Sequence, residues 1–273
     1  MRFLLDLEII GKERLLPFNY QYPISAWIYK TIHEGNHAFA SFLHNKGFGN
    51  GSKSYKLFTF SQFTFPPKSF RVAGNRMQLL SDSARITLSF FVPEAMQSFI
   101  AGLFQQQEFG IGDRESAVRF KVRQVESLPA PNFTAYGRFA CLSPIMVSSY
   151  RLDRKQAQYL KPDHADYERI FFDNLARKYA AALQAGLIEN SMSSLNAATE
   201  MRLVFKEPVK KKGIIVKTGT AMQTQIIGYM FDFEVWAPPE LLLLGYCAGF
   251  GEKNSLGMGC VKQLEVGINK VRN

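Results

Sequence analysis

The segment 249–259 constrains the fold of this chain more than any other part of its sequence. It reads Gly-Phe-Gly-Glu-Lys-Asn-Ser-Leu-Gly-Met-Gly, with two Gly-x-Gly pairs around a lysine, an amide and a hydroxyl. Because glycine has no Cβ, the backbone N–H groups of such a loop can approach a ligand closely. Successive N–H groups beside a lysine form a concavity that binds anions, so this glycine-rich loop predicts a phosphate ligand.

The elements around the loop exclude the two common nucleotide-binding motifs. A mononucleotide-binding loop requires Gly-Lys followed by Ser or Thr, and no such sequence follows the second glycine pair. A dinucleotide-binding loop opens a helix after a strand, with a Gly-x-Gly-x-x-Gly spacing that differs from the spacing here. The apolar residues 239–248 instead predict a helix before the loop, and residues 260–266 predict a strand after it.

The charge of the chain favours nucleic acid as the source of that phosphate. The 273 residues include 33 Lys and Arg against 23 Asp and Glu, which gives a formal charge of +10. A basic balance of this size is typical of proteins that bind a polyanion. It disfavours the alternative of a metabolic ferredoxin-like enzyme that binds a phosphorylated small molecule.

Other features of the composition bound the class of protein. Every apolar run is shorter than the roughly 18 residues of a membrane span, so we expect no membrane partner. In residues 1–8, apolar residues alternate with acidic ones, and this pattern is unlike that of a signal peptide. Cys141, Cys247 and Cys260 stand singly, which argues against a disulfide framework or a metal site and predicts a cytoplasmic protein.

Both halves of the sequence predict nearly the same order of strands and helices. In the first half, apolar periodicity predicts strands at 2–10, 57–63, 84–91 and 118–126, a hairpin at 70–80, and helices at 22–32, 37–44 and 92–104. In the second half it predicts strands at 137–147, 200–205, 214–217, 223–236 and 260–266, and helices at 165–187 and 239–248. Each half approximates the βαββαβ order, so the fold class is α+β, with two tandem ferredoxin-like (RRM-like) domains and a C-terminal Gly-rich loop. The segment 127–132 sets the expected boundary between domains 1–130 and 131–273.

Several short motifs accompany this pattern. Leu142-Ser143-Pro144-Ile145 stands at the start of the second domain, and the first domain carries Ile28-Tyr29, Leu43-His44 and Lys56-Leu57-Phe58-Thr59 in that order. Together with the glycine-rich loop before the last strand, these motifs resemble the CRISPR-associated repeat-processing endoribonucleases of the RAMP superfamily. The resemblance covers nearly the whole chain and implies a protein that cuts precursor CRISPR RNA within each repeat.

The resemblance assigns the catalytic roles to Tyr29, His44 and Lys56. It implies metal-independent attack by the 2′-OH of the RNA itself, without a cofactor, leaving a 2′,3′-cyclic phosphate and a 5′-OH, so DNA should not be cut. Histidine transfers protons near neutral pH, lysine offsets charge on the phosphate, and tyrosine can orient or deprotonate the 2′-OH. Which of His44 and Tyr29 is the acid and which is the base stays open. Taken singly, the three indicate a packing tyrosine, a surface histidine and a strand-edge lysine, and only their combination with the loop favours catalysis.

The expected RNA-binding residues come from the loop and from two basic groups outside it. The loop contributes Gly249, Gly251, Lys253, Asn254, Ser255, Gly257 and Gly259. The basic groups, for which solvation or phosphate contact are both open, are Arg71 and Arg76 beside a predicted turn, and Lys210, Lys211 and Lys212 at a predicted hairpin tip. We expect the RNA to lie in the cleft between the domains, with the loop on its backbone.

The sequence leaves further alternatives open. His33 and His37 have the spacing of a zinc-binding pair, but Gly35 between them weakens a helix, so we expect both in a loop and keep His37 as the alternative catalyst. The same fold suits a non-catalytic repeat-RNA-binding protein, or a guide-RNA-holding subunit of a CRISPR ribonucleoprotein complex. The flexible composition of residues 47–54, between the catalytic histidine and lysine, favours the non-catalytic alternative. Other effector-complex subunits and a second copy of the chain, as a homodimer, are candidate partners that the sequence does not locate.

Overall fold

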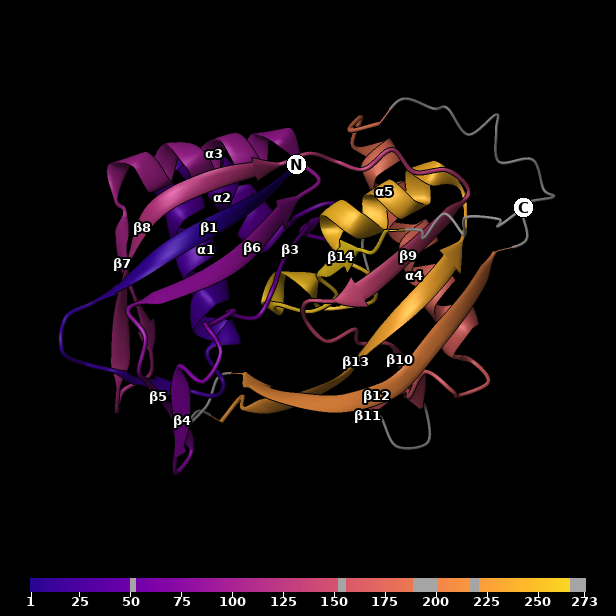
Figure 1. Cartoon of the computed structure of the whole chain (residues 1–273). Coiled ribbons are helices and arrows are strands. Elements are labelled where there is room, and N and C mark those ends of the chain that lie inside the picture. Colours follow the sequence, from indigo (N-terminus) through magenta and orange to yellow (C-terminus); the bar gives the residue numbers. More distant parts are fainter. Residues whose placement is uncertain (50–52, 152–155, 189–200, 217–220, 266–273) are drawn as a thin grey trace, which may run out of the picture.

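The first half of the chain forms a five-stranded sheet in the order β3-β6-β1-β8-β7 (Figure 1). The computed structural model describes residues 1–49, 53–151, 156–188, 201–216 and 221–265. The strands of this sheet are β1 (Arg2–Ile10), β3 (Phe58–Phe60), β6 (Ser83–Phe90), β7 (Glu108–Gly112) and β8 (Ala117–Leu128). The helices of this half are α1 (Gln21–Gly35), α2 (His37–Asn45) and α3 (Pro93–Gln105). The order β3-β6-β1-β8, with α1 after β1 and α3 after β6, is ferredoxin-like, and β7 extends it at one edge.

The second half repeats this arrangement with a four-stranded sheet in the order β12-β13-β9-β14. Its strands are β9 (Tyr136–Cys141), β12 (Arg202–Val216), β13 (Thr224–Trp236) and β14 (Val261–Gln263). Its helices are α4 (Tyr167–Gln184), which follows the β10 (Ser148–Arg151) and β11 (Gln156–Tyr159) hairpin, and α5 (Pro239–Ala248). The predicted α+β class with tandem ferredoxin-like units is therefore confirmed, whereas the boundary at residue 130 stays a prediction.

Short or glycine-containing strands were missed by the sequence patterns. β7 holds two glycines in five residues, and β2 (Leu15–Pro17) has only three residues, so neither alternates clearly. β2 pairs with β5 (Arg76–Leu79), which forms the predicted hairpin with β4 (Phe70–Ala73). The predicted strand 137–147 was too long, since β9 ends at Cys141, shortly before a proline that cannot donate a ladder hydrogen bond.

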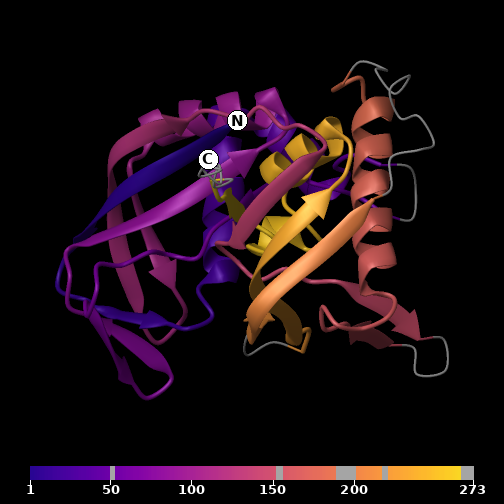
Figure 2. The ribbon, with the colours of Figure 1, turned by 45° about the vertical axis from the view of Figure 1, so that its right-hand side comes forward.

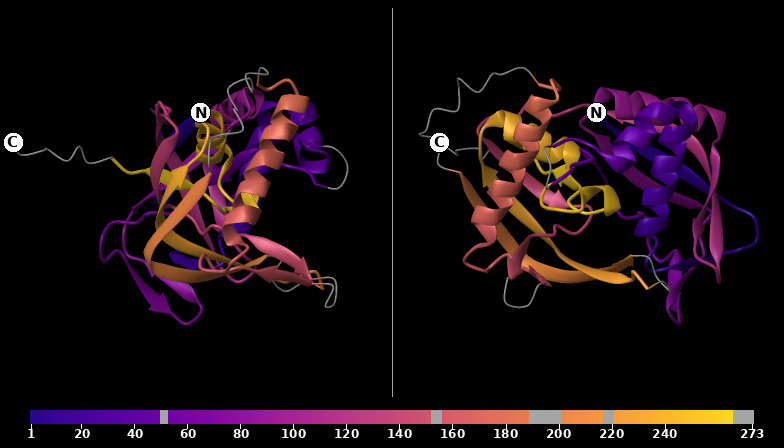
Figure 3. Two further views of the ribbon diagram at one scale, coloured as in Figure 1. Left: turned by 90° about the vertical axis from the view of Figure 1, so that its right-hand side faces the viewer. Right: turned by 180° about the vertical axis from the view of Figure 1, so that it is seen from behind.

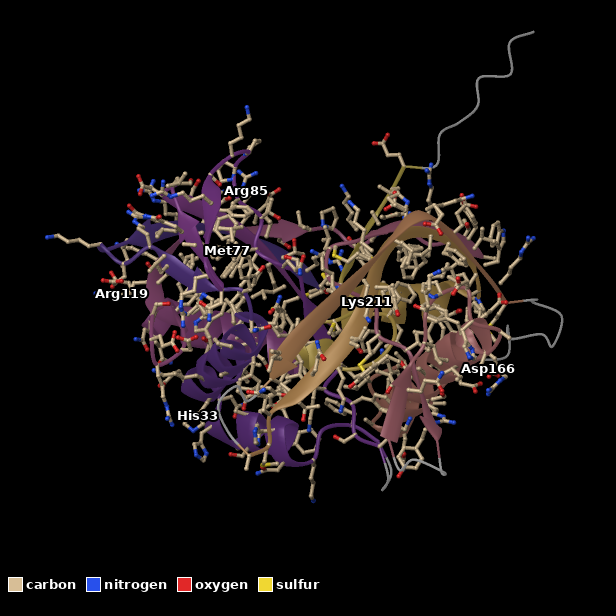
Figure 4. All side chains as sticks on the ribbon, turned by 90° about the horizontal axis from the view of Figure 1, so that it is seen from below. His33, Met77, Arg85, Arg119, Asp166 and Lys211 are labelled. Atoms are coloured by element: carbon tan, nitrogen blue, oxygen red, sulfur yellow. The ribbon has the colours of Figure 1, made fainter. Side chains whose placement is uncertain are left out.

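Within the described residues, the strands predicted at 200–205 and 214–217 fall on one long strand, β12, while residues 200 and 217 lie outside the described ranges. Its pairing with β13 shifts register between Lys206 and Lys210, and this irregularity interrupts the alternation from which strands are predicted. The basic run Lys210–Lys212 pairs with residues 228–230 of β13, so the prediction of a hairpin tip was wrong. Figure 4 shows Lys211 along this strand pair.

The helices α1 and α4 lie on the same side of the molecule, as the rear view in Figure 3 shows. From a different angle, Figure 2 shows α4 beside the second sheet, with the glycine-rich loop between α4 and the first half. One hydrophobic core runs through both halves, from Leu5 and Phe90 in the first to Phe233 and Phe250 in the second. The two sheets thus form one packed body, and the surface between their helices is where the glycine-rich loop lies.

Arg2 joins the two halves at their buried junction. Its side chain is 2% exposed and donates to the carbonyl oxygens of Val261 (2.5 Å) and Tyr246 (2.6 Å). The guanidinium carbon also lies 3.6 Å from the centroid of the Tyr246 ring. Since a buried charge without partners is costly, these carbonyls and the ring make the burial of Arg2 tolerable.

Of the helices in the described ranges, none has the length and apolar character needed to cross a membrane.

Candidate nucleic-acid cleft

A cleft of about 740 Å³ opens between the two halves, and it contains all three predicted catalytic side chains. It is bounded by α1, the end of α2, the segment that leads into β3, α4 and the glycine-rich loop. The lining residues are Tyr22, Ser25, Ala26, Tyr29, His44, Lys53, Ser54, Tyr55, Lys56, Leu57, Asn174, Lys178, Glu252, Lys253, Asn254, Ser255 and Leu256. The predicted location of the site, between the domains and beside the loop, agrees with this geometry.

Tyr29, His44 and Lys56 lie together although they come from different elements. The rings of Tyr29 and His44 are 5.4 Å apart and nearly perpendicular, at 84°. The Lys56 ammonium donates to the His44 carbonyl oxygen at 2.9 Å. A two-hydrogen-bond bridge between Phe48 and Tyr55 closes the connection between α2 and β3, and this closure returns the lysine to the end of α2. The composition of the intervening residues suggested that they separate the histidine from the lysine. The structure instead holds the two side chains close together.

The environment of each group affects its protonation. Burial raises the pKa of Tyr29 to about 12, partly offset by a hydrogen bond with Ser255, so this hydroxyl keeps its proton at neutral pH. Burial lowers the pKa of Lys56 from its ordinary value. The His44 ring is exposed, and its Nδ1 lies 3.1 Å from Asn45 Oδ1. Since an amide oxygen only accepts, Nδ1 carries the proton in this arrangement, and Nε2 of the neutral ring is left as an acceptor.

The glycines of the loop have a structural role that the sequence did not predict. Gly249, Gly251, Gly257 and Gly259 are buried and have φ values of 92°, 66°, 80° and 74°, which favour glycine. A Cβ on any of the four would lie within 2.5 Å of another atom. The four glycines therefore allow the loop to pack tightly, and their contact with phosphate stays a prediction.

Many polar groups of the loop are also satisfied inside the protein. The N–H groups of Glu252 and Gly259 donate to the carbonyl oxygens of Met146 and Pro144, at 2.8 and 2.7 Å. The Asn254 side chain is buried and donates to two loop carbonyl oxygens, each at 3.0 Å. In the described loop, hydrogen bonds inside the protein thus take up part of the expected row of N–H groups, but not the successive N–H groups of Lys253, Asn254 and Ser255. What the loop presents to the cleft is the exposed Lys253, in a left-handed conformation, and the half-buried Ser255.

Lys178 is a functional candidate that the sequence reading missed. It is 2% exposed on α4, and its ammonium donates to Gly249 O at 2.7 Å and Gly251 O at 2.6 Å. Burial lowers its pKa to about 7. In the sequence it resembles a solvated helix lysine. The available signal was its spacing, seven residues after Phe171 and three after Leu175, which places it on the apolar face of the helix.

The depressed pKa of Lys178 predicts how stability depends on pH. Because the folded pKa of about 7 lies below the unfolded value of 10.5, the unfolded chain binds more protons between these values, and stability rises with pH. Between pH 7 and 9 this contribution is about 2 kcal/mol. Urea unfolding at both pH values should show the rise in the wild type and lack it in Lys178→Met. An equal rise in Lys178→Met, or its loss in the exposed control Lys121→Met, would contradict this role.

The remaining predicted binding residues lie outside the cleft lining. Arg76 is buried and forms ion pairs with Asp113 and Glu115, so its predicted contact with RNA phosphate does not fit the structure. Arg71 is exposed and donates to the side chain of Gln78. The Lys210–Lys212 side chains are exposed along β12. A phosphate contact by Arg71 or by these lysines stays a prediction for RNA that extends beyond the cleft.

The sequence predicted that His33 and His37 lie in a loop, and this prediction was wrong. They lie near the end of α1 and at the start of α2, with ring centroids 4.4 Å apart. Gly35 between them ends α1 where a Cβ would lie 1.9 Å from Ser98 O, so the glycine permits close packing against α3. Neither histidine lines the cleft. Across the residues that the structure describes, no group of three or more His, Cys, Asp or Glu side chains could hold a metal ion.

Two ferredoxin-like units, with a glycine-rich loop packed between them beside a cleft that contains a tyrosine, a histidine and a lysine, define the class of fold and site. Comparison with known families gives a more specific assignment. The family model described as CRISPR-associated protein Cas6, N-terminal, matches residues 15–126, and the model described as CRISPR associated protein Cas6, C-terminal, matches residues 128–263. The chain belongs to the Cas6 family.

Individual relatives match over nearly their full length. The chain is 30% identical over 264 residues to the CRISPR-associated endoribonuclease Cas6 of Pyrococcus furiosus, covering 96% of this chain and 89% of the relative. It is 28% identical over 267 residues to the CRISPR-associated endoribonuclease Cas6 1 of Methanocaldococcus jannaschii, covering 97% and 93%. Among solved structures, that of a Cas6-related gene product from Pyrococcus furiosus has a TM-score of 0.79 at 23% identity, covering 97% and 99% of the two chains, and supports the fold.

Proposed function

We propose that this protein is an endoribonuclease that cuts precursor CRISPR RNA within its repeats by metal-independent attack of the 2′-OH. The observation that carries the proposal is the convergence of Tyr29, His44 and Lys56 on one cleft. Relatives named CRISPR-associated endoribonucleases, similar over nearly the whole chain, support the same activity. The products are a 2′,3′-cyclic phosphate and a 5′-OH.

The protonation states in the cleft support separate roles for the three side chains. His44 Nε2, an acceptor in the neutral ring, takes the proton of the attacking 2′-OH. Tyr29 keeps its proton because its pKa is about 12, and it gives that proton to the 5′-oxygen as the P–O5′ bond breaks, which leaves the 5′-OH. Lys56 donates one N–H to the His44 carbonyl and has two more donors for the charge that develops on the phosphate.

Cleavage of the host's own repeat RNA in EDTA tests this proposal directly. We expect one cut per repeat, no cut when the scissile nucleotide carries 2′-deoxyribose, and an upstream fragment whose mass includes a cyclic phosphate. A requirement for added divalent metal, or continued cutting of the 2′-deoxy substrate, would overturn the mechanism. Both RNAs should bind with similar affinity, since the missing hydroxyl removes the nucleophile and leaves the phosphate contacts in place.

A second candidate function is stable holding of repeat RNA without cleavage. The observation that favours it is the exposure of the His44 ring, which within the described ranges has only the adjacent Asn45 as a side-chain hydrogen-bond partner. A catalytic histidine is normally held in place by packing and by hydrogen bonds to the residues around it. In the EDTA experiment this function gives a stable complex and intact RNA. If binding also requires other CRISPR subunits, a role within a larger ribonucleoprotein is favoured.

A further inference from the structure

The cleft continues into a second hollow over α4, and the two share three residues. This α4 hollow, of about 280 Å³, lies between α4 and the start of the β10–β11 hairpin. Lys53, Asn174 and Glu252 line both the cleft and the α4 hollow. Beyond them, the α4 hollow is lined by the exposed Tyr150 and Arg177 among other residues. An RNA strand that occupies the cleft therefore has a continuous path toward this hollow.

The shared boundary contains a buried amide without a partner. Asn174 is 8% exposed, and its Oδ1 is inaccessible and accepts no hydrogen bond from the described residues. Its Nδ2 also donates to none of them, but it is not among the inaccessible atoms. Leaving a buried polar group unpaired costs about 1–3 kcal/mol, so native proteins rarely do so without a reason. In contrast, the Glu252 carboxylate on the same boundary is occupied by the N–H and hydroxyl of Ser148, each at 2.9 Å.

A second unpaired group and an unpaired cation lie close to this amide. The Tyr55 hydroxyl, which lines the cleft, is also buried without a hydrogen-bond partner, and both Arg177 and Glu252 influence its ionisation. Arg177 forms no ion pair with any described residue, whereas Arg169 on the same helix pairs with two aspartates. An amide oxygen on the boundary, a hydroxyl in the cleft and a guanidinium in the α4 hollow thus have no hydrogen-bond or ion-pair partner in the described protein.

We propose that this boundary binds one unpaired nucleotide of the RNA beside the scissile phosphate, with Asn174 reading its base. The two donors of the accessible Asn174 Nδ2 match acceptors on the edge of a splayed-out base. Arg177, three residues along α4, contacts the phosphate of the same nucleotide. Because Asn174 and Arg177 lie on one helix, their spacing is held rigidly. This inference rests on the proposed function and specifies how its substrate is selected.

The test measures the affinity of uncut RNA for base-substituted repeats. Each nucleotide near the scissile phosphate is changed in turn, in RNA that carries 2′-deoxyribose at the scissile position. The wild type should discriminate at one of these positions by about 5- to 100-fold, the range that one amide–base pair supplies. Asn174→Leu, of similar size, should lose discrimination there and keep it elsewhere. Asn174→Asp, which exchanges donors for acceptors, should change the preferred base at that same position.

Arg177→Ala should weaken the binding of all these RNAs by a similar factor and reduce the salt dependence of binding. Its matched control is Arg114→Ala, an exposed arginine between β7 and β8 that lines neither hollow, and this change should leave affinity unaltered. Unchanged base discrimination in both folded Asn174 variants, as judged by thermal melting, overturns the subsite. If the wild type binds the RNA and discriminates through Asn174 as expected but cuts no cleavable repeat RNA, the proposed catalysis is overturned and the subsite is retained. If no RNA binds to the wild type, both proposals fail.

Discussion

Replacement of His44 by alanine should lower the single-turnover rate of repeat RNA cleavage by about 10²- to 10⁴-fold, the usual contribution of a positioned general acid or base. The affinity for uncut RNA should change little, because the ring is exposed and its removal leaves the backbone carbonyl that holds Lys56. Rates with saturating protein and affinities with 2′-deoxy RNA measure the two quantities separately.

His37→Ala is the matched control, since it removes an exposed histidine from the same helix but outside the cleft. Its cleavage rate should equal that of the wild type. If His37→Ala is inactive while His44→Ala cuts normally, the catalyst is the other histidine of α2. If both variants cut at the wild-type rate, neither of these two histidines is the catalyst.

Gly259→Ala should destabilise the protein by about 4 kcal/mol or more, within the range reserved for severe packing and backbone conflicts. The residue has φ of 74°, and a Cβ there would lie 1.9 Å from Phe250 O. Relief of this clash requires movement of buried backbone, since the Phe250 N–H also donates to the Gly259 carbonyl. Urea unfolding, together with RNA affinity, measures the loss of the loop.

Gly74→Ala separates the two causes of this destabilisation. Gly74 has a similar φ of 61° in the turn between β4 and β5, but a Cβ there would meet nothing within 4 Å. Gly74→Ala should therefore lower the free energy of unfolding by only the left-handed backbone penalty of about 1–2 kcal/mol. Equal losses in the two variants would mean that the backbone angle alone, and not the packing of the loop, requires glycine at 259.

The order of elements was predictable because it depends on local periodicity. β1 was predicted with its observed bounds, and α1, α2, α3 and α5 were each predicted within a few residues. The ferredoxin-like order then follows from the sequence of strands and helices. The short connection between α2 and β3 was misjudged because the Phe48–Tyr55 bridge that closes it is a tertiary feature, which composition does not show.

The partners of polar groups were not predictable in the same way. Arg76 and Lys178 are both buried, and what they bind comes from distant segments, Asp113 and Glu115 for the first and the glycine-rich loop for the second. The loop looked like a phosphate cradle because the sequence shows its N–H groups but not the connection between β9 and β10, where the Met146 carbonyl accepts from one of them. Composition identified the loop as special, and only packing decided which of its atoms face the cleft.

The burial of Arg2 has a consequence for how the protein is made. Its two carbonyl partners belong to α5 and β14, with Val261 259 residues further along the chain. On a ribosome, the first strand is therefore synthesised long before the groups that neutralise its second residue. Until they emerge, the first half must either keep this guanidinium in water or bury it at a cost of several kcal/mol. We expect the nascent chain to complete its fold late, when the segment after the glycine-rich loop leaves the exit tunnel and closes both halves at once.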